Sequence, residues 1–249
     1  MNEEFYIGYK SRGPSGLARH TRVAVLAVGL LTALATALTA ARQTPADSGT
    51  FEYGITRTFE GVLHEMPLPM LRTVSPAGGV TNYLLVGAGK HGLPACARGH
   101  DGERVRFQGS LIRRRRAVMI ELNRPSSFEA LGRRPVGETE ARPRVIGEAV
   151  LSGELVDTKC WHGVMRPATG KVHRACAVRC LSGGVPPGLL VRDGGGNGTV
   201  VLLTSDTGAP LKFDPQWAAR IVTADGTLEY RDEIPILRVR RLALAPSPR

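Results

Sequence analysis

The stretch GELVDTKCWHGVMRPATGKVHRACAVRCLSGGVPP, residues 153–187, organises the second half of this chain. It concentrates thiol, imidazole and thioether side chains, which are the ligands of soft and borderline metal ions. These side chains are Cys160, His162, Met165, His173, Cys176 and Cys180. No other stretch of the sequence gathers chemistry in this way, so it is the candidate functional segment.

The spacing within this segment predicts a short helix. Cys176 and Cys180 are four positions apart, and His173 precedes Cys176 by three. In a helix over residues 172–181 these three side chains project from one face. The Gly-Gly and Pro-Pro pairs that follow are typical of a helix end and a constrained loop. We expect Cys160 to reach the same place from the end of a preceding strand, ELVDTKC.

A resemblance rests on the same residues. The pattern G-E-L-V-D-x-K-C, then G-V-M, then H-R-A-C-A-x-x-C and G-G-x-P-P, resembles a group of uncharacterised membrane-anchored or exported bacterial proteins. The likeness is strongest over residues 147–190. It implies a location and an architecture rather than an activity. His162 stands where the resemblance leads us to expect a small or apolar residue.

The amino-terminal part predicts a membrane anchor. Residues 23–40, VAVLAVGLLTALATALTA, contain no charge and are long enough to cross a bilayer core of about 30 Å. Four basic residues precede this run and Arg42 follows it, so the amino terminus is expected in the cytoplasm. The alternative is a signal peptide cleaved near the small residues at 39–41. The long polar region before the apolar run favours an uncleaved anchor.

This topology sets the expected location of the rest of the chain. We expect a single-pass protein of the bacterial cytoplasmic membrane, with its carboxy-terminal domains in the periplasm. Positions 1–43 hold five basic and two acidic residues, so the remainder carries +8 of the net charge of +11. Export argues against a nucleic-acid partner. The basic charge is typical of a solvated face or of one that meets anionic lipid head groups.

The exported part is expected to be mainly β. Gly and Pro are abundant, aromatic residues are few, and short apolar runs alternate with turn signals. Both halves show an apolar strand, an Asp-Gly turn, an alternating strand and an arginine-bearing strand, which suggests two OB-like β-barrel modules. The second module carries the Cys/His-bearing helix. The expected boundaries are 1–22 cytoplasmic tail, 23–41 anchor, 42–58 linker, 59–124 first module, 125–146 linker, 147–244 second module and 245–249 tail.

Several local predictions accompany this reading. Residues 103–122 are expected to form two strands that part around Gly109. Asp225-Gly226 is expected to be a turn that matches Asp101-Gly102 in the first module. Residues 215–222, PQWAARIV, are a candidate short helix, and residues 189–204 a hairpin with a glycine-rich tip.

Three interpretations of the cysteines stay open. An oxidising compartment favours a disulfide from Cys160 to Cys176 or Cys180, with Cys96 pairing the remaining thiol. Alternatively, the three cysteines and His173 form a tetrahedral zinc site. In the third interpretation the Cys176/Cys180 pair exchanges disulfides, although its C-x-x-x-C spacing differs from the C-x-x-C of thioredoxin-like proteins.

Other residues extend the metal interpretation. Met165 would make the ligand set softer and suit Cu(I), and His162 is a further candidate ligand. Asp157 precedes Cys160 by three positions and is expected to orient a ligand by a hydrogen bond, or to make a turn contact. The expected cofactor is therefore zinc or copper. His91, Cys96 and His100 in the first module are taken as incidental.

The sequence favours an accessory protein over an enzyme. It contains no G-x-S-x-G, no P-loop, and no G-x-G-x-x-G after a strand. We therefore expect an anchored subunit that binds a transition metal or docks to a protein partner in a membrane or periplasmic redox system. The alternatives are a thiol-disulfide exchanger and a structural module held by disulfides.

Overall fold

The computed structural model describes residues 15–42, 47–133, 143–194 and 198–245. The chain divides into two units, 1–46 and 47–249. The first contains helix α1 (Ser15–Arg42), whose Leu- and Ala-rich sequence without proline favours a helix. None of its described residues is buried. Among the described residues it is the one helix long and apolar enough to cross a membrane.

The second unit begins with a closed barrel of five strands. They are β2 (Arg57–His64), β3 (Met70–Val74), β4 (Val80–Gly87), β5 (Glu103–Arg114) and β6 (Ala117–Leu122). Neighbouring strands run in the order β5-β2-β3-β4-β6, and pairing of β6 with β5 closes the ring. Every pair is antiparallel except β4 with β6, which is parallel.

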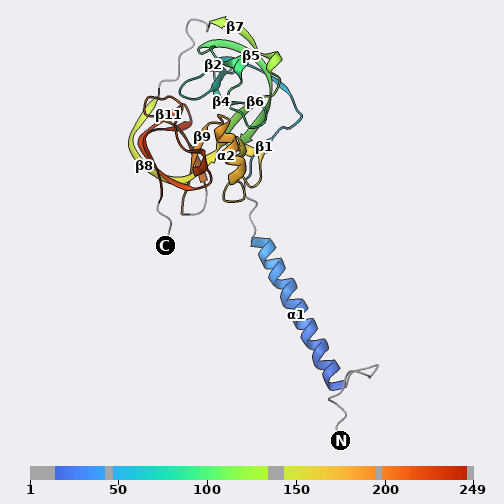
Figure 1. Ribbon diagram of the computed structural model, residues 1–249. Coiled ribbons are helices and arrows are strands. Elements are labelled where there is room, and N and C mark those ends of the chain that lie inside the picture. Colours follow the sequence, from blue (N-terminus) through green and yellow to red (C-terminus); the bar gives the residue numbers. More distant parts are fainter. Residues whose placement is uncertain (1–14, 43–46, 134–142, 195–197, 246–249) are drawn as a thin grey trace. The chain divides into compact units, whose positions relative to one another are not determined.

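A second closed barrel repeats this arrangement. Its strands are β8 (Arg144–Asp157), β9 (Pro187–Arg192), β10 (Gly198–Ser205), β11 (Ile221–Arg231) and β12 (Ile234–Leu244). In both barrels the first strand pairs with the second and fourth, and the third pairs with the second and, in parallel, with the fifth. This is the strand order of a five-stranded OB barrel, so the predicted fold class is confirmed. Figure 1 shows the first barrel in green and the second in yellow to red.

Smaller elements surround the barrels. Strands β1 (Thr50–Phe51) and β7 (Glu129–Arg133) both pair with β5. The described residues also contain the 3₁₀ turns η2 (Ala95–Ala97), η3 (Pro125–Ser127) and η5 (Pro215–Trp217). The connection between β8 and β9 carries the π-helical turn η4 (Cys160–Val164) and helix α2 (Arg174–Ser182). The candidate functional segment is thus inserted between the first and second strands of the second barrel.

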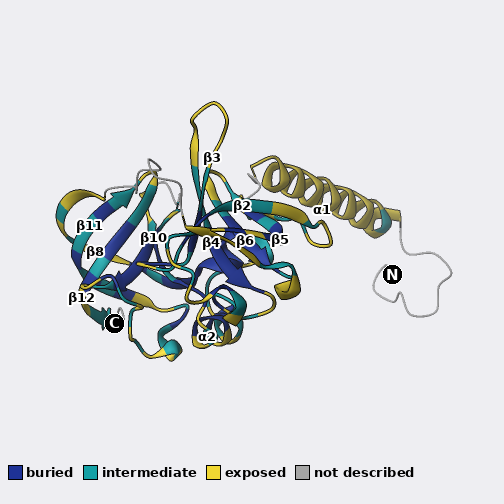
Figure 2. Ribbon diagram, turned by 90° about the horizontal axis from the view of Figure 1, so that it is seen from above, coloured by how far each residue is buried: buried dark blue, intermediate teal, exposed yellow. Residues whose placement is uncertain are grey.

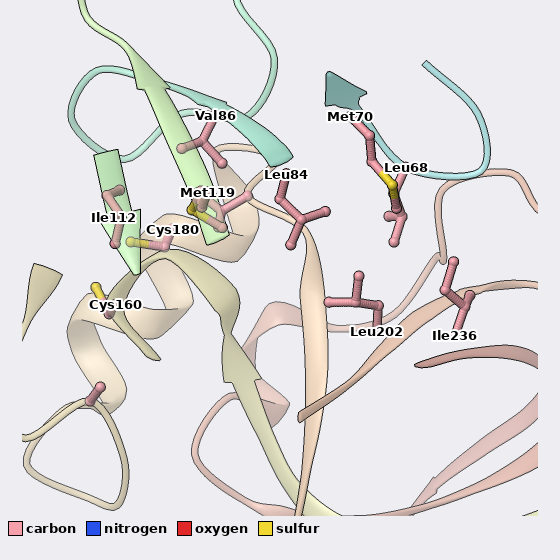
Figure 3. Packing of buried hydrophobic residues seen from close by; sticks show 12 residues of the cluster. Leu68, Met70, Leu84, Val86, Ile112, Met119, Cys160, Cys180, Leu202 and Ile236 are labelled. Atoms are coloured by element: carbon pink, nitrogen blue, oxygen red, sulfur yellow. The ribbon is translucent and has the colours of Figure 1, made fainter. Parts of the chain in front are cut away.

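Apolar side chains fill each barrel and also the seam between them. Figure 2 shows that many of the buried residues lie along the strands of the barrels. Successive side chains of a strand point to opposite faces, so the inward-facing positions form the core. A separate cluster joins Leu84, Ile112 and Met119 of the first barrel to Leu202 of the second. Cys160 and Cys180 belong to this seam cluster and lie beside Ile112 and Met119 in Figure 3. The functional segment is therefore packed between the two barrels.

The two predicted glycine breaks are wrong for a common reason. Strand β5 continues through Gly109. A Cβ at this position would meet the backbone oxygen of Glu121 at 2.6 Å, so the neighbouring strand β6 can approach only because the residue is a glycine. The chain turns instead at Arg115, which has φ of 53°. Gly226 lies inside β11 at a β-bulge, where a Cβ would meet the oxygen of Arg238 at 1.9 Å. Both glycines permit close strand approach and do not make turns.

Other expected boundaries also differ from the structure. Residues 42–58 were expected to be a linker, but β1 pairs with β5 and the second unit begins at Asp47. The expected linker 125–146 contains η3, β7 and the start of β8, while residues 134–142 lie outside the described residues. The candidate helix at 215–222 is only the single turn η5, followed by β11. The tip of the expected hairpin, 195–197, lies outside the described residues, and its strands β9 and β10 are paired.

Candidate metal centre

The end of strand β8 turns the chain into the site. Asp157 is fully buried, and its Oδ1 accepts a hydrogen bond of 2.8 Å from the backbone N–H of Cys160. The hydroxyl of Thr158 donates to the carbonyl of Pro186 at 2.8 Å, which ties the start of the segment to its end. These local side-chain contacts replace the strand ladder and allow the tight turn η4. Cys160 is thereby placed at a fixed position beside β8.

Helix α2 supplies the other two thiols. Its Ala177 and Leu181 pack into the core of the second barrel, while Cys180 belongs to the seam cluster. Cys176 lies one turn before Cys180 and is half-buried. The amphipathic character of this short helix thus fixes which side its cysteines face.

The three thiols form one cluster. The sulfur atoms of Cys160, Cys176 and Cys180 all lie within 4.8 Å of one another, and that of Cys160 is 3.9 Å from that of Cys176. Cys160 and Cys180 are only 2% and 1% exposed. A metal–sulfur bond of about 2.3 Å places two sulfurs of a tetrahedral site about 3.8 Å apart. The cluster therefore has the dimensions that a metal ion requires.

No disulfide joins these cysteines in the structure. All four cysteines, including Cys96, are free thiols. Cys96 packs against the core of the first barrel, where burial raises the pKa of its thiol. The expected pairing of Cys96 with a cysteine of the second module is therefore not found.

His173 lies at the edge of the thiol cluster and is buried. Its Nε2 is 2.9 Å from Oδ2 of Asp157, and its ring, this carboxylate and the sulfur of Cys160 form a second group with ligand atoms within 4.8 Å of one another. Asp157 thus contacts both His173 and the backbone of Cys160. An imidazole held by a carboxylate in this way is a common arrangement at metal sites.

The other two sequence candidates lie apart from this group. His162 is buried, and its Nδ1 lies 2.5 Å from the carbonyl oxygen of Thr158. Burial lowers the pKa of His162 to about 4. It is absent from the two groups of ligand atoms found among the described residues. Met165 follows η4 and is 42% exposed, unlike the buried thiols.

A lysine of the first barrel also belongs to the site, and no sequence pattern pointed to it. Lys90, in the loop after β4, places its Nζ 2.7 Å from the sulfur of Cys176. This hydrogen bond raises the pKa of Lys90. Lys90 lies in a turn-rich stretch of the sequence, 86 positions before Cys176. A positive charge here favours thiolate over thiol in the cluster.

Lys159 fixes the position of that loop. Its Nζ donates to the carbonyls of Gly87 and Gly89 at 2.7 and 2.6 Å and lies 2.5 Å from a carboxylate oxygen of Glu121. The side chain of Lys159 is only 1% exposed. The only sequence signal was its place beside Cys160 in the D-x-K-C pattern. Lys159 therefore connects the functional segment to the wall of the first barrel.

Two glycines allow the barrels to meet at this point. The backbone N–H of Gly92 donates to the carbonyl of Gly183 at 2.9 Å. A Cβ on Gly183 would lie 1.8 Å from the carbonyl oxygen of Lys90. Gly183 was expected to end the helix, which it does as the residue after Ser182. The structure adds that any side chain there would push the Lys90 loop away.

The thiols of the cluster share protons unequally. A hydrogen bond from Cys160 lowers the pKa of Cys180, and Lys90 lowers it further. The contact with Cys180, together with burial, raises the pKa of Cys160. Of these two thiols, Cys180 therefore loses its proton more readily than Cys160. A cation would replace these shared protons, which is how thiol sites bind metals.

The similarity of the chain to known proteins is limited. No family model and no curated protein matches it. One solved structure with detectable similarity is a deletion mutant of the single-stranded DNA-binding protein from Thermus aquaticus, with 12% identity, coverage of 81% of this chain and 97% of that chain, and a TM-score of 0.21. A TM-score of this size carries no argument. The fold assignment rests on the strand pairings, and the candidate site on its own geometry.

Proposed function

We propose that this chain is a single-pass accessory protein of the bacterial cytoplasmic membrane that holds a zinc or copper ion in its second barrel. The observation that carries the proposal is the gathering of three cysteine sulfurs within 4.8 Å at the seam of the barrels. In this proposal the barrels lie in the periplasm and serve a membrane or periplasmic redox system.

The ligand set favours a soft or borderline ion. Cys160, Cys176 and Cys180 would supply three thiolates, and His173, whose ring contacts Asp157, would supply the fourth ligand. Three sulfurs alone suit Cu(I), whereas three sulfurs with an imidazole suit zinc. Three thiolates with either ion leave a net negative charge. The ammonium group of Lys90, 2.7 Å from Cys176, would offset part of it.

The proposed location rests on sequence features and helix α1. The helix is long and apolar enough to cross a membrane, and basic residues precede it. The flanking charges favour a cytoplasmic amino terminus. The resemblance of residues 147–190 to membrane-anchored or exported bacterial proteins supports the same placement. In this location the basic surface would face anionic lipid rather than nucleic acid.

A second candidate function is thiol-disulfide exchange. Its specific support is the contact between Lys90 and the half-buried Cys176, because a nearby ammonium group activates a thiol. Cys160 lies 3.9 Å from Cys176 and Cys180 lies one helical turn away, so either is a candidate resolving partner. This function requires one cysteine that reacts rapidly with an alkylating reagent near neutral pH.

Metal content and thiol reactivity, measured together, test both functions. The full-length chain is purified in a non-ionic detergent, exposed in turn to zinc and to Cu(I), and desalted. We expect about one ion per chain, lost in Cys176→Ser and Cys180→Ser and weakened in His173→Ala. Cys96→Ser is the matched control, because Cys96 packs against the core of the first barrel and belongs to neither group of ligand atoms, so this variant should retain the ion.

Two outcomes would decide against the metal. If the protein takes up neither ion while its three cluster thiols are free, the metal proposal is wrong. If, in addition, one of these thiols is alkylated much faster than free cysteine at pH 7, thiol-disulfide exchange becomes the supported function in place of metal binding. Equal loading of the wild type and the three site variants would place any bound ion elsewhere.

A further inference from the structure

A cavity lies at the seam of the barrels, and its lining residues Leu84 and Leu202 pack in the same cluster as Cys160 and Cys180. Its volume is about 420 Å³, which falls within the range of small-molecule sites. Both barrels and turn η4 line it, including Leu84, Val118, Trp161, Val200 and Ile234. Trp161 and His162 directly follow Cys160, so the turn that places a thiol in the cluster also places two rings at the cavity. The proposed metal ligands do not line it.

The cavity combines apolar walls with basic residues. Arg114, Arg115 and Arg116, at the turn between β5 and β6, belong to its lining. The guanidinium of Arg114 lies 3.4 Å from the centroid of the Trp161 ring and donates to the Trp161 carbonyl at 2.9 Å. A planar cation stacked on an indole is held in a fixed orientation. The basic groups are thus placed at the cavity by packing.

Acidic groups offset only part of this charge. The carboxylate of Asp47 contacts Arg115 at 3.1 Å. Glu233 lies 3.8 Å from Arg116, but their side chains are 86% and 93% exposed, so this pair is weak. In the described part of the chain, the hydrogen bonds of Arg114 go to the backbone oxygens of Trp161 and Asp47. The cavity therefore retains positive charge for an anionic group.

The connection to helix α1 points to an occupant from the membrane. The chain leaves α1 at Arg42, and only residues 43–46 separate it from Asp47, which contacts Arg114 and Arg115. This step rests on the proposed function: a protein anchored in a membrane by α1 meets amphiphiles that carry an acyl chain and a charged head group. Apolar walls would take an acyl chain, and the arginines would take its acidic head group.

We propose that this cavity binds an amphiphile with a single acyl chain and an acidic head group, either a carboxylate or a phosphate. The arginines at the turn between β5 and β6 contact the head group, and Trp161 contacts the acyl chain. This site is separate from the proposed metal centre. Its occupant is recognised by charge at one end and by apolar contact along the rest of its length.

Quenching of Trp161 fluorescence tests the proposal. The full-length chain in a non-ionic detergent carries Trp217→Phe, which leaves Trp161 as the remaining tryptophan. The probe is dodecanoate brominated near the end of its tail, since bromine quenches an indole on contact. We expect saturable quenching, with the half-saturating concentration at least about tenfold higher in Arg115→Gln/Arg116→Gln. Val118→Phe, which fills the cavity, should have a similar effect.

A matched control and three competitors sharpen the result. Arg104→Gln/Arg106→Gln removes the same charge from β5 away from the cavity lining and should bind like the wild type. Dodecyl phosphate should displace the probe, while dodecanol and dodecyltrimethylammonium should require at least about tenfold more. The relative strength of dodecyl phosphate and dodecanoate identifies the preferred head group.

Other results would overturn the proposal. Quenching that is equal in all variants reports uptake into the detergent micelle alone. Equal displacement by the phosphate, the alcohol and the ammonium compound would show that charge plays no part. Metal content is measured on the same samples. A variant that loses probe binding but keeps its metal is altered only at the cavity. A variant that loses both is altered in the packing between the two barrels.

Discussion

The two barrels share one strand order but differ in the connection between their first and second strands. In the first barrel only residues 65–69 separate β2 from β3. In the second barrel residues 158–186 separate β8 from β9 and carry η4 and α2. The proposed metal ligands all lie on this insertion, and Asp157, which contacts His173, is the last residue of β8. The same scaffold thus carries a site in one copy and a short turn in the other.

The first barrel, which lacks this insertion, nevertheless contributes to the site. Its Lys90 contacts Cys176, and its Glu121 pairs with the buried Lys159. Its Leu84 and Ile112 pack in the same cluster as Cys160 and Cys180. The insertion therefore supplies the ligands while the first barrel supplies the charge and the wall around them. Substitutions on the two sides of the seam should separate these contributions.

The largest effect is expected for Lys159→Met. This change removes the cation from a buried pair and leaves Glu121 and the carbonyls of Gly87 and Gly89 without their partner. Breaking a buried ion pair on one side costs about 3–5 kcal/mol. Denaturant unfolding of the barrels measures this loss in the free energy of unfolding. The matched control is Arg104→Met, whose pair with Glu60 is exposed and screened by solvent, so its loss should change the stability little. Similar losses for both variants would contradict this role of Lys159.

Gly183→Ala should have the next largest effect. The added Cβ would meet the carbonyl oxygen of Lys90 at 1.8 Å, so the loop of the first barrel must move. Overpacking of this kind costs about 1–3 kcal/mol, and the contact of Lys90 with Cys176 should weaken with it. Thermal unfolding and metal content measure the two effects. Gly194→Ala is the control, because a Cβ there has nothing within 4 Å. If Gly183→Ala loads metal and unfolds like this control, the seam is not closed as described.

Lys90→Met should have a smaller, pH-dependent effect. The raised pKa of Lys90 means that its contact with Cys176 stabilises the fold fully below the ordinary lysine pKa of 10.5. This contribution is lost as the pH rises through the folded-state pKa, which lies above 10.5. We expect a loss of about 1 kcal/mol at pH 8 that shrinks at higher pH. Unfolding measured across this range tests it, with Lys171→Met as the control and Lys90→Arg as the conservative variant. A loss that stays constant with pH would exclude the charge as its cause.

The smallest effect is expected at Glu60, far from the insertion. Hydrogen bonds from Arg106 and Arg104 lower the pKa of its carboxyl group. The resulting stabilisation is present above the ordinary pKa of 4.5 and is lost as the pH falls through the lower folded-state value. Glu60→Gln should therefore leave metal content unchanged and lower the melting temperature only slightly at pH 7. A larger effect than that of Lys90→Met would reverse the ranking of surface and seam contacts.

Local patterns in the sequence were reliable where chain neighbours decide the structure. The charge-free run at 23–40 lies within helix α1, and VTNYLLVG at 80–87 is strand β4. Cys176 and Cys180 lie on one short helix, as their spacing predicted. The weak likeness between the two halves corresponds to two barrels of the same strand order. Helical and strand periodicities are set by residues a few positions apart, so the sequence alone reveals them.

The same patterns gave wrong predictions where contacts with strands distant in sequence determine the local structure. Gly109 and Gly226 looked like turn residues, yet each lies inside a strand. The neighbouring strand approaches these positions too closely for any side chain, which is why glycine stands there. His162 was a possible ligand in the sequence because it is an imidazole within the same segment as the cysteines. The turn η4 instead directs it toward the carbonyl of Thr158, outside the ligand groups. Adjacency in sequence did not imply adjacency at the site.

The sequence by itself therefore determined the apolar helix, the mainly β architecture and the candidate ligands. Only the tertiary structure decided that Cys160 meets Cys176 and Cys180, that Lys90 reaches them, and that Lys159 pairs with Glu121. The physical reason is that periodicity and spacing act within a single element, whereas these contacts form across the seam between two barrels. They arise from the packing of apolar side chains and glycines that brings the barrels together, and no local pattern encodes that approach.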